Sequence, residues 1–585
     1  MDELYLEVFS DPVCGTVRVP LETLVTLFCL KYCECTDYNM ILVLKSAKKP
    51  SFTVKIYDFV FVLQTNDDVK NVARMCRLPA VVRTDKSVTG LCAVLRQIVK
   101  SKSGDKCHSL LGFRQGCLIA CAESSIWTRF CEVDIINSVN ELVQRNDTFD
   151  SVRIPDDVAQ FESFDSVRIP DDVARFEIHM NQPVRIHNIQ KKNQDLMKSK
   201  RKLRMGTENI ALCHNIDHVF AEGPVMTLAD IILFPCFHVI LQIIRNVYLQ
   251  PYIPLTVRWY ENMKLQLGIE ESLYIIGDVR NMIENELYVK YILPDVPNKS
   301  LYKSDPKRYK PKNRQFTRQE DVDVSLKLIE ELGLELEWEQ YPFGYELEFD
   351  WSALPYEAHP EGGNLPAVRM ERKGQQLENL AKAVLKLARP GHTIVDFCSG
   401  SGHLGIVLAY FLPRCKIILL ENKEESLSRA QQRVYKLKLT NVMFYQGNID
   451  YFCGEFDIGV SLHACGVATD LVIQQCINQN AVFICCPCCY GSVQNNHIVT
   501  YPRSRFLQNS AMSVREYLVL GHAADQTHDE FNVKTDQGKV CMGIIDMDRC
   551  LQAKELGYTV SLSKLIPETC TPKNNLLVGI PQNWF

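Results

Sequence analysis

Hydrophobic residues in the last part of the chain, from about residue 366 onward, form short continuous runs separated by helix-like patterns. The strand-like runs include TIVDFC, KIILLE, NVMFYQG, FDIGVSL and AVFICC, and segments such as HLGIVLAYFL and EESLSRAQQRVYKLKL lie between them. Continuous apolar runs are typical of parallel strands that are covered on both faces. The alternation with short turns therefore predicts a Rossmann-like, doubly wound α/β sheet over 366–585.

The first half of the chain shows two other patterns. Residues 1–105 alternate strand-like runs such as ELYLEVFS and MILVLKS with helix-like segments, which predicts a small α/β domain. Apolar positions over 106–290 are mostly at helical spacing, as in TLADIILFPCFHVILQIIRNVY, which predicts a helical domain. An irregular insert, 146–206, contains two copies of FDSVRIPDDVA, and we interpret them as a duplicated surface segment because two copies are too few for a solenoid.

A basic and then acidic segment, 291–365, is predicted to link the two halves. Its basic run, Lys299 to Arg318, interleaves lysines and arginines with Tyr302, Tyr309 and Phe316. Aromatic rings stack on unpaired bases while cations contact phosphates, so this run is a candidate RNA-binding segment. A solvated linker is the alternative interpretation.

Composition limits the possible partners and the compartment. The 585 residues carry a net charge of −5, which argues against a general nucleic-acid-coating or membrane-coating role. The longest apolar stretch, IILFPCFHVILQII from Ile231, contains Pro235 and is shorter than the roughly 20 residues that a membrane span needs. The acidic N-terminal stretch lacks the pattern of a signal peptide, so we expect a cytoplasmic protein with reduced cysteines and no membrane partner.

The stretch VDFCSGSGHLGI, Val395 to Ile406, is the candidate cofactor loop. Glycines at 400, 402 and 405 allow a ligand to approach the backbone at the end of a strand, and a helix beginning near His403 points amide hydrogens at it. NAD and S-adenosylmethionine fit this pattern equally well, and both need an acidic residue further along the chain to hold ribose hydroxyls. Glu421, at the end of KIILLE, is the candidate.

Asp396 favours S-adenosylmethionine over NAD. A carboxylate about 5 Å from a pyrophosphate charge costs roughly 3 kcal/mol at an effective dielectric of about 20, whereas an ammonium or sulfonium group is attracted. A dehydrogenase remains the alternative. Asn448 and Asp450 follow the third strand, where a side chain can meet the adenine amino group, although turn chemistry also explains them. The predicted cofactor-binding residues are Asp396, Cys398, Gly400, Gly402, His403, Gly405, Glu421, Asn448 and Asp450.

One histidine and a group of cysteines lie at the ends of the next strands. His463 is the candidate catalytic residue, since it could accept the proton of the methyl acceptor or orient that acceptor, with a structural role as the alternative. CCPCC contains two overlapping C-x-x-C pairs, Cys485 with Cys488 and Cys486 with Cys489, and Cys465 lies nearby in the predicted fold. Structural zinc usually takes two well-separated ligand pairs, so we interpret these cysteines as buried thiols and predict no metal.

Several of these motifs resemble known families. VDFCSGSGHLGIVLA, LLENKEESLSRAQQR, VSLHACGVATD, FICCPCCYG and TPKNNLLVGIP closely resemble the family of glutathione S-transferase C-terminal domain-containing proteins. LHACGVATD and the cysteine loop are also similar to segments of a tRNA ribose 2′-O-methyltransferase family. The resemblance implies an S-adenosylmethionine-dependent methyltransferase whose favoured substrate is RNA, either tRNA or rRNA.

The first half resembles glutathione transferases. LPAVV around Pro79 is similar to their cis-proline strand, and Thr227 to Asp230 resembles their helix N-capping box. This implies a thioredoxin-like domain over 1–105 and a glutathione-transferase C-terminal-like domain over 106–290.

The glutathione-binding pattern is nevertheless incomplete. Lys86 precedes Ser87 where such enzymes carry Glu-Ser, and Ser10 and Cys14 are not in the context expected of a nucleophile. We therefore expect this half to dock protein partners rather than to transfer glutathione. A non-catalytic adapter that keeps both folds is the second hypothesis, and a glutathione-dependent transferase is the third.

Overall fold

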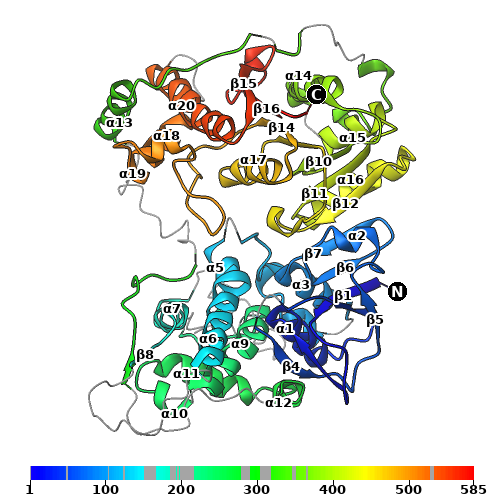
Figure 1. The fold of residues 1–585 in the computed structure, drawn as a ribbon, viewed down its shortest axis with the longest axis vertical. Coiled ribbons are helices and arrows are strands. Elements are labelled where there is room, and N and C mark those ends of the chain that lie inside the picture. Colours follow the sequence, from blue (N-terminus) through cyan, green and yellow to red (C-terminus); the bar gives the residue numbers. More distant parts are fainter. Residues whose placement is uncertain are drawn as a thin grey trace. The chain divides into compact units, whose positions relative to one another are not determined.

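The computed structural model describes most of the chain: residues 2–47, 50–102, 105–122, 125–149, 166–184, 193, 197, 217–244, 246–277, 290–302, 318–340, 342–344, 351–363, 367–527 and 532–584. The first copy of the duplicated segment and most of the basic run Lys299 to Arg318 lie outside these residues. The chain divides into two compact units, Met1–Tyr309 and Lys310–Phe585, and each is described by itself (Figure 1).

The second unit contains a mostly parallel sheet, as predicted. Its strand order is β15-β16-β14-β13-β10-β11-β12. Strands β10 to β14 are parallel to one another, and β16 is antiparallel to both β14 and β15. The strands are β10 (Thr393–Phe397), β11 (Lys416–Glu421), β12 (Val442–Gln446), β13 (Ile458–Leu462), β14 (Val482–Cys486), β15 (Tyr558–Lys564) and β16 (Asn575–Pro581).

This order differs from that of a dinucleotide-binding sheet. Strands β10 to β14 follow the familiar 3-2-1-4-5 arrangement, but the last strand, β16, is inserted antiparallel between β14 and β15. The chain order reverses between β10 and β13, which are neighbours in the sheet. Ligands of such sheets bind outside the carboxyl ends of the strands at this point, which is where Asp396 and His463 lie.

Helices α14 (Ala367–Leu387), α15 (His403–Phe411) and α16 (Glu424–Lys436) share one hydrophobic core with the sheet. On α14 the predicted apolar face is buried, with Leu377, Leu380 and Val384 inaccessible to solvent. This helix ends at Leu387, shortly before the Pro-Gly pair at 390–391. Its other faces are free to present polar side chains toward the carboxyl ends of the strands.

A buried charge network joins α17 (Val467–Gln479), α20 (Val533–Glu555) and the loop after β14. The Arg549 guanidinium donates to both oxygens of Asp470, at 3.0 and 2.6 Å, and to Asp546 at 2.9 Å. Tyr501 donates to Asp470 at 2.8 Å and Tyr490 donates to Asp546 at 2.7 Å. Because these groups are almost inaccessible to solvent, both carboxylates rely on Arg549 for charge balance, and Asp470 is also paired with Arg503 at 3.7 Å.

The first unit begins with a five-stranded sheet in the order β7-β6-β1-β3-β5. Strands β1, β3 and β5 are parallel, and β6 is antiparallel to β1 and β7. The Leu78–Pro79 peptide bond just before β6 is cis, as the resemblance implied. The strands are β1 (Asp2–Val8), β3 (Tyr38–Leu44), β5 (Phe61–Thr65), β6 (Ala80–Val82) and β7 (Lys86–Thr89).

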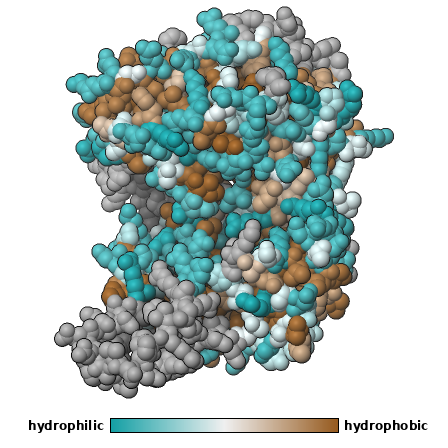
Figure 2. All heavy atoms as spheres, viewed as in Figure 1, coloured by the Kyte–Doolittle hydropathy of each residue, from teal (hydrophilic) through white to brown (hydrophobic). Residues whose placement is uncertain are grey.

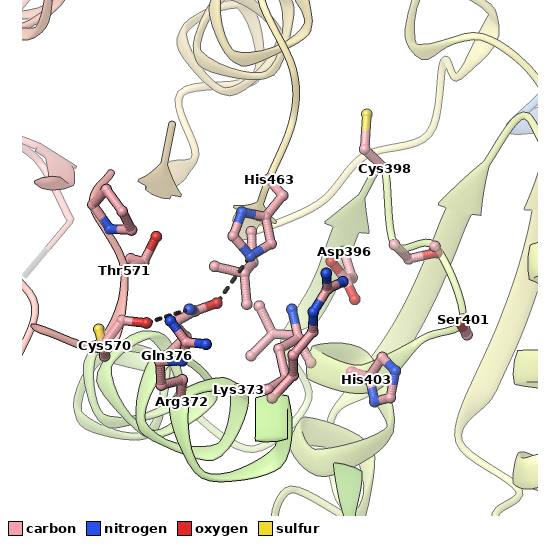
Figure 3. Close-up of a pocket in the computed structure, with 16 residues that line it drawn as sticks. Arg372, Lys373, Gln376, Asp396, Cys398, Ser401, His403, His463, Cys570 and Thr571 are labelled. Atoms are coloured by element: carbon pink, nitrogen blue, oxygen red, sulfur yellow. Dashed lines mark hydrogen bonds between the residues drawn. The ribbon is translucent and has the colours of Figure 1, made fainter. Parts of the chain in front are cut away.

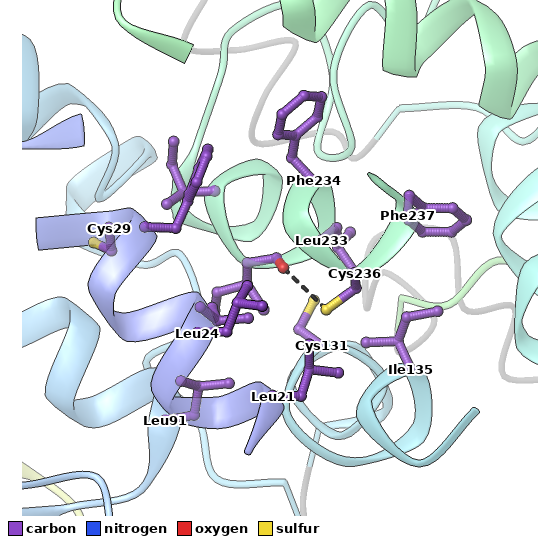
Figure 4. Packing of buried hydrophobic residues seen from close by; sticks show 14 of the residues in the cluster. Leu21, Leu24, Cys29, Leu91, Cys131, Ile135, Leu233, Phe234, Cys236 and Phe237 are labelled. Atoms are coloured by element: carbon purple, nitrogen blue, oxygen red, sulfur yellow. Dashed lines mark hydrogen bonds between the residues drawn. The ribbon is translucent and has the colours of Figure 1, made fainter. Parts of the chain in front are cut away.

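The core of this unit lies between α1 (Leu21–Tyr32) and α9 (Leu228–Ile244), where Phe28 and Phe234 have ring centroids 5.9 Å apart (Figure 4). Helix α9 contains the apolar stretch that the sequence assigned to a buried helix. At the start of α9 the Asp230 carboxylate accepts a hydrogen bond from the Thr227 amide at 2.8 Å, as in a capping box. The Thr227 hydroxyl departs from that motif, because it donates to the same carboxylate at 3.2 Å instead of accepting from a helix amide. Burial explains the difference, because a fully enclosed carboxylate needs every donor in reach.

Two described parts of the predicted linker 291–365 are well packed. Helix α13 (Gln319–Glu331) packs against α19 (Val514–Ala524). Tyr302, one of the aromatics assigned to RNA stacking, is only 7% exposed and its ring lies edge-on to His179. Tyr302 therefore belongs to the core of the first unit, not to a base-stacking surface.

On the face drawn in Figure 2, hydrophilic side chains predominate and hydrophobic ones form scattered patches. Within the described ranges, no helix combines the length and the apolar character that crossing a membrane requires.

Candidate functional site

A cavity of about 710 Å³ lies at the carboxyl ends of β10 and β13, within the size range of small-molecule sites (Figure 3). It is bounded by α14, by the glycine loop after β10, by the end of β13 and by the loop before β16. The lining residues are Arg369, Arg372, Lys373, Gln376, Asp396, Cys398, Ser399, Gly400, Ser401, His403, Leu404, Leu462, His463, Cys570, Thr571 and Pro572.

Asp396 lies in the wall of this cavity and is 2% exposed. Its Oδ2 accepts a hydrogen bond from the Gly405 amide, in the first turn of α15, at 2.9 Å. Burial raises the pKa of Asp396 to about 7, although the Gly405 amide and Lys373 act in the opposite direction. Burial also lowers the pKa of Lys373 to about 8, while Asp396 favours its charged form.

The hydrogen bond from the Gly405 amide to Asp396 affects which ligand the site can bind. Amides in the first turn of such a helix are the groups that a dinucleotide site directs at the pyrophosphate. Here the Gly405 amide already donates to Asp396, so it is not available to an anion, and a carboxylate occupies the position in front of it. The position beside Asp396 is therefore better suited to a positively charged group of a ligand than to a pyrophosphate.

The glycine loop is held in shape by Glu421, the predicted ribose-binding residue. One Glu421 oxygen accepts from the Gly400 amide at 2.8 Å and the other from the Lys423 amide at 2.8 Å. Gly400 and Gly402 have φ values of 57° and 74°, which favour glycine. Ser399 Oγ, in the same loop, is buried and has no hydrogen-bond partner among the described residues. This hydroxyl on the cavity wall is therefore available to a polar atom of a ligand or to water.

Gly405 is required by packing. A Cβ at this position would lie 2.1 Å from Leu419 Cδ2 and 3.1 Å from Asp396 Oδ2. We expect Gly405→Ala to lower the free energy of unfolding by about 1–3 kcal/mol, because the helix must move away from the sheet. Denaturant titration followed by circular dichroism measures this change.

Gly374→Ala, within α14, is the matched control. Its Cβ would meet the Trp351 ring at 3.5 Å, which is an ordinary van der Waals contact. We expect this variant to be unchanged or more stable by about 0.5–1 kcal/mol. Equal destabilisation by both substitutions would contradict the packing argument.

Arg433, on α16, anchors the loop from behind. Its guanidinium donates to the carbonyl oxygens of Glu357 at 2.8 Å, Ser401 at 3.0 Å and His359 at 3.2 Å. His403 Nδ1 lies 3.4 Å from the same guanidinium. Burial and the charges of Arg433 and Lys373 lower the pKa of His403 to about 3, so its ring is neutral at physiological pH.

His463 reaches the cavity from the end of β13, where its backbone φ is 71°. Gln376 Nε2 donates to the Cys570 carbonyl at 3.0 Å, which orients the amide so that Gln376 Oε1 faces His463 Nε2 at 2.9 Å (Figure 3). Since the amide oxygen only accepts, His463 Nε2 carries the hydrogen and Nδ1 carries the lone pair. Burial and then Lys373 lower the pKa of His463 to about 4.

Not every predicted cofactor-binding residue lines this cavity. Gly402 and Gly405 shape the loop and the helix start, and Glu421 acts on the loop from the end of β11. Asn448 and Asp450 lie beyond β12, where Asp450 Oδ2 is 3.4 Å from His497 Nε2. Asp450 Oδ1 is buried and has no partner among the described residues, so one acceptor is available there.

The sequence reasoning missed the residues that α14 and the loop before β16 contribute. Arg369, Arg372, Lys373 and Gln376 lie at positions i, i+3, i+4 and i+7 of α14, so they share one helix face. That polar spacing beside the apolar face could have identified them. Cys570, Thr571 and Pro572 gave no comparable signal.

The cysteines group differently from the predicted C-x-x-C pairs. Cys485 and Cys486 are buried inside β14, and burial raises the pKa of both thiols, that of Cys485 to about 12. The sulfur atoms that come together are those of Cys465, Cys488 and Cys489. Hydrogen bonds from Cys488 and then from Cys489 outweigh burial and lower the pKa of the Cys465 thiol to about 6.

Comparison with known proteins defines the class first. A family described as "Methyltransferase domain" matches residues 372–496, which include the cavity-lining part of α14, β10 and β13. The C-terminal half of the chain therefore carries a methyltransferase domain. A Drosophila pseudoobscura pseudoobscura protein named "Glutathione S-transferase C-terminal domain-containing protein homolog" is 43% identical over 86% of this chain and 85% of its own length. The chain belongs to the glutathione S-transferase C-terminal domain-containing protein family.

Two further likenesses are more limited. "Ribosomal RNA small subunit methyltransferase G" of Thermotoga sp. (strain RQ2) is 35% identical over 63 residues, which are 11% of this chain and 28% of that protein. A crystal structure of an SAH-bound methyltransferase from Podospora anserina has 11% identity and a TM-score of 0.26, covering 41% of this chain and 100% of that one.

Proposed function

We propose that this protein is an S-adenosylmethionine-dependent methyltransferase that acts on RNA. The observation that carries the proposal is the hydrogen bond from the Gly405 amide to Asp396 at the strand-order reversal of a methyltransferase domain. The Asp396 carboxylate thereby occupies the amide that a dinucleotide site would leave free for the pyrophosphate. A sulfonium compound with an ammonium group is compatible with that carboxylate.

The residues present fit this cofactor. Asp396 would attract the ammonium group, and Lys373 and Arg372 would attract the methionine carboxylate. The partnerless hydroxyl of Ser399 would hydrogen-bond a polar atom of the ligand. When bound, the cofactor supplies an electrophilic methyl group. Two proposed cofactor-binding residues lie outside the cavity lining. Glu421 would bind the ribose hydroxyls, and Asp450 would bind the adenine amino group.

The protein's own contribution to methyl transfer is alignment and a proton acceptor. Gln376 fixes the His463 ring so that Nδ1 keeps its lone pair. We propose that His463 orients the methyl acceptor through that nitrogen or takes its proton. His463→Asn removes the ring base and keeps a polar side chain, so the variant should bind the cofactor while methylating more slowly.

RNA is the favoured substrate because of charge at the cavity. Arg369 is exposed on α14 where it lines the cavity, and guanidinium groups pair with phosphates in a bidentate manner. The segment shared with a ribosomal RNA methyltransferase supports the same class. The basic run Lys299 to Arg318 remains a proposed RNA contact, apart from the buried Tyr302.

The first unit is proposed to be a thioredoxin-like domain followed by a glutathione-transferase C-terminal-like domain that docks protein partners. The strand order of its sheet and the cis bond before Pro79 support this assignment. Lys86 and Ser87, at the position where glutathione would be held, are only 4% and 0% exposed. Their burial favours docking over glutathione transfer.

The proposal is tested by incubating the full-length protein with a tritiated methyl donor and total RNA from cells that lack the protein. We expect label in that RNA, little label in RNA from cells that contain the protein, and clearly less label with Asp396→Asn. Label in protein instead of RNA would overturn the substrate class. Calorimetry that detects no binding of S-adenosylmethionine or S-adenosylhomocysteine would favour the adapter hypothesis.

Cofactor affinity should depend on pH through Asp396. With a pKa of about 7, the carboxyl is about one tenth ionised at pH 6 and about nine tenths ionised at pH 8. Only the ionised form attracts the ammonium group, which alone would raise affinity roughly tenfold over this range. Lys373, with a pKa of about 8, loses about half its charge by pH 8 and reduces this rise by about twofold. Calorimetry at pH 6, 7 and 8 measures it, and Asp396→Asn should bind weakly with a flat profile. A flat profile in the unsubstituted protein would contradict this role.

A further inference from the structure

We propose that Cys465, Cys488 and Cys489 form a binding site for one thiophilic divalent metal ion, with Zn²⁺ as the ion their chemistry favours. The site goes beyond the proposed methyltransferase function. Three cysteine sulfurs are a ligand set that zinc takes readily, and three protein ligands leave a fourth position open.

The three sulfur atoms already form a compact triangle. Cys465 Sγ lies 3.2 Å from Cys488 Sγ and 3.4 Å from Cys489 Sγ, and the remaining pair is 3.5 Å apart. A disulfide would need about 2.05 Å, so the contacts are non-bonded. Around a tetrahedral zinc with Zn–S distances of about 2.3 Å, neighbouring sulfurs lie about 3.8 Å apart. Metal binding therefore needs an expansion of only a few tenths of an ångström.

The fold brings these cysteines together from two loops. Cys465 follows β13 and the other two follow β14, and these neighbouring parallel strands end at the same edge of the sheet. The Gly466 amide donates to the Cys489 carbonyl at 3.0 Å and so ties the loops to each other. Gly466 has a φ of 58°, and a Cβ there would lie 2.8 Å from the Ser492 carbonyl oxygen, so glycine is required for this approach.

The cysteine loop is also anchored from its far side. Asp525 accepts from the Tyr490 amide at 3.0 Å and from the Gly491 amide at 2.9 Å. Lys573 forms an ion pair with Asp525 at 3.2 Å. The cluster is thus held by α19 and the segment before β16, independently of any bound ion. A metal site whose ligands are held in advance loses less entropy on binding.

Charge around the cluster suits a metal bound by thiolates. Three thiolates and one divalent ion carry a net charge of −1. The positive charge of Lys423 stabilises the Cys465 thiolate, and those of Lys573 and Lys373 favour negative charge on the sulfurs of the β14 loop. The negative charge of Asp525 acts against thiolate formation. Binding would deprotonate the remaining thiols and release their protons to solvent.

The fourth coordination position would face outward. Among the described residues, no other His, Cys, Asp or Glu joins this group. Cys465 is exposed, and its sulfur is 3.5 Å from the carbonyl oxygen of His463, whose ring lines the cavity. Because Cys465 is exposed, the open position would be available to water.

The test uses the full-length protein, reduced and stripped of metal, then titrated with Zn²⁺ against a competing chelator. We expect one ion per chain, and we expect Cys465→Ser, Cys488→Ser and Cys489→Ser each to weaken binding at least 100-fold. Cys453→Ser, at an exposed cysteine outside the cluster, is the matched control and should bind like the unsubstituted protein. Melting curves confirm that the variants are folded.

A second measurement requires no substitution. Co²⁺ added to the unsubstituted protein should give sulfur-to-metal charge-transfer absorption whose intensity corresponds to three thiolates, and Zn²⁺ should displace it. Absence of this absorption, equal loss of binding in Cys453→Ser, or full zinc retention by a variant in which Cys465, Cys488 and Cys489 are all replaced by serine would overturn the proposal. Cofactor binding by the metal-free protein is measured separately, so failure of this site is distinguishable from failure of the methyltransferase proposal.

Discussion

Replacing Arg549 with methionine is expected to lower the free energy of unfolding of the C-terminal unit by about 3–5 kcal/mol. The arginine is 1% exposed and donates to Asp470 and Asp546, which are themselves 1% and 0% exposed. Methionine fills similar space but leaves Asp546 without its paired arginine and Asp470 with only Arg503, 3.7 Å away, in a medium that solvates charge poorly. Helix α17 and the loop after β14 should loosen first, since both are held through these carboxylates.

Hydrogen exchange measured by mass spectrometry is the appropriate readout, because peptides from the two units report on each separately. We expect faster exchange in peptides of α17 and of the loop after β14, with peptides of the first unit unchanged. Arg515→Met is the matched control, since Arg515 pairs with Asp321 at 3.1 Å on the surface and is 57% exposed. Exposed pairs are worth about 0–1 kcal/mol, so equal effects of the two substitutions would refute the argument.

Asp396→Ala should weaken binding of S-adenosylmethionine at least 100-fold, or about 2.7 kcal/mol. The substitution removes the charge that attracts the cationic ligand and leaves the buried Gly405 amide without its acceptor. Asp396→Asn retains an acceptor for that amide but no charge, so an intermediate loss would separate the two contributions. Calorimetry with the full-length protein measures all three affinities.

Asp457→Asn provides the control for Asp396. Asp457 accepts from the Thr393 amide at 2.7 Å, at the opposite end of β10 from the cavity, and should not affect cofactor binding. NAD should bind none of these proteins well. If Asp396→Ala bound NAD tightly while its affinity for S-adenosylmethionine stayed unchanged, the dehydrogenase alternative would be correct and the proposed cofactor wrong.

The sheet of the C-terminal unit was predictable because its strands are continuous apolar runs with polar residues at their carboxyl ends. Asp396 and His463 follow from the same reasoning, since neighbouring parallel strands end at one edge. Their hydrogen-bond partners do not follow from it. Gln376 lies on a helix before the first strand, and which face of that helix meets the sheet is decided by packing between distant segments.

The cysteine cluster shows the limit of motif spacing. Cys485 and Cys488 have the spacing of a metal-binding pair, but the strand ends between them, so one thiol is buried in the sheet and the other lies in a loop. Cys465 is 23 residues away from Cys488 and joins it only because β13 and β14 are adjacent. Spacing along the chain reports such a group only when all its members lie in one turn or hairpin.

Strand β16 is the last strand of its sheet to be synthesised, yet it lies between β14 and β15 and not at an edge. While the polypeptide is still being translated, β14 therefore has one unpaired side that can associate with other nascent chains. We expect chaperones to cover this unit until synthesis passes residue 581. A premature stop codon that removes only 575–585 would delete an interior strand, so the truncated product should be cleared by proteolysis.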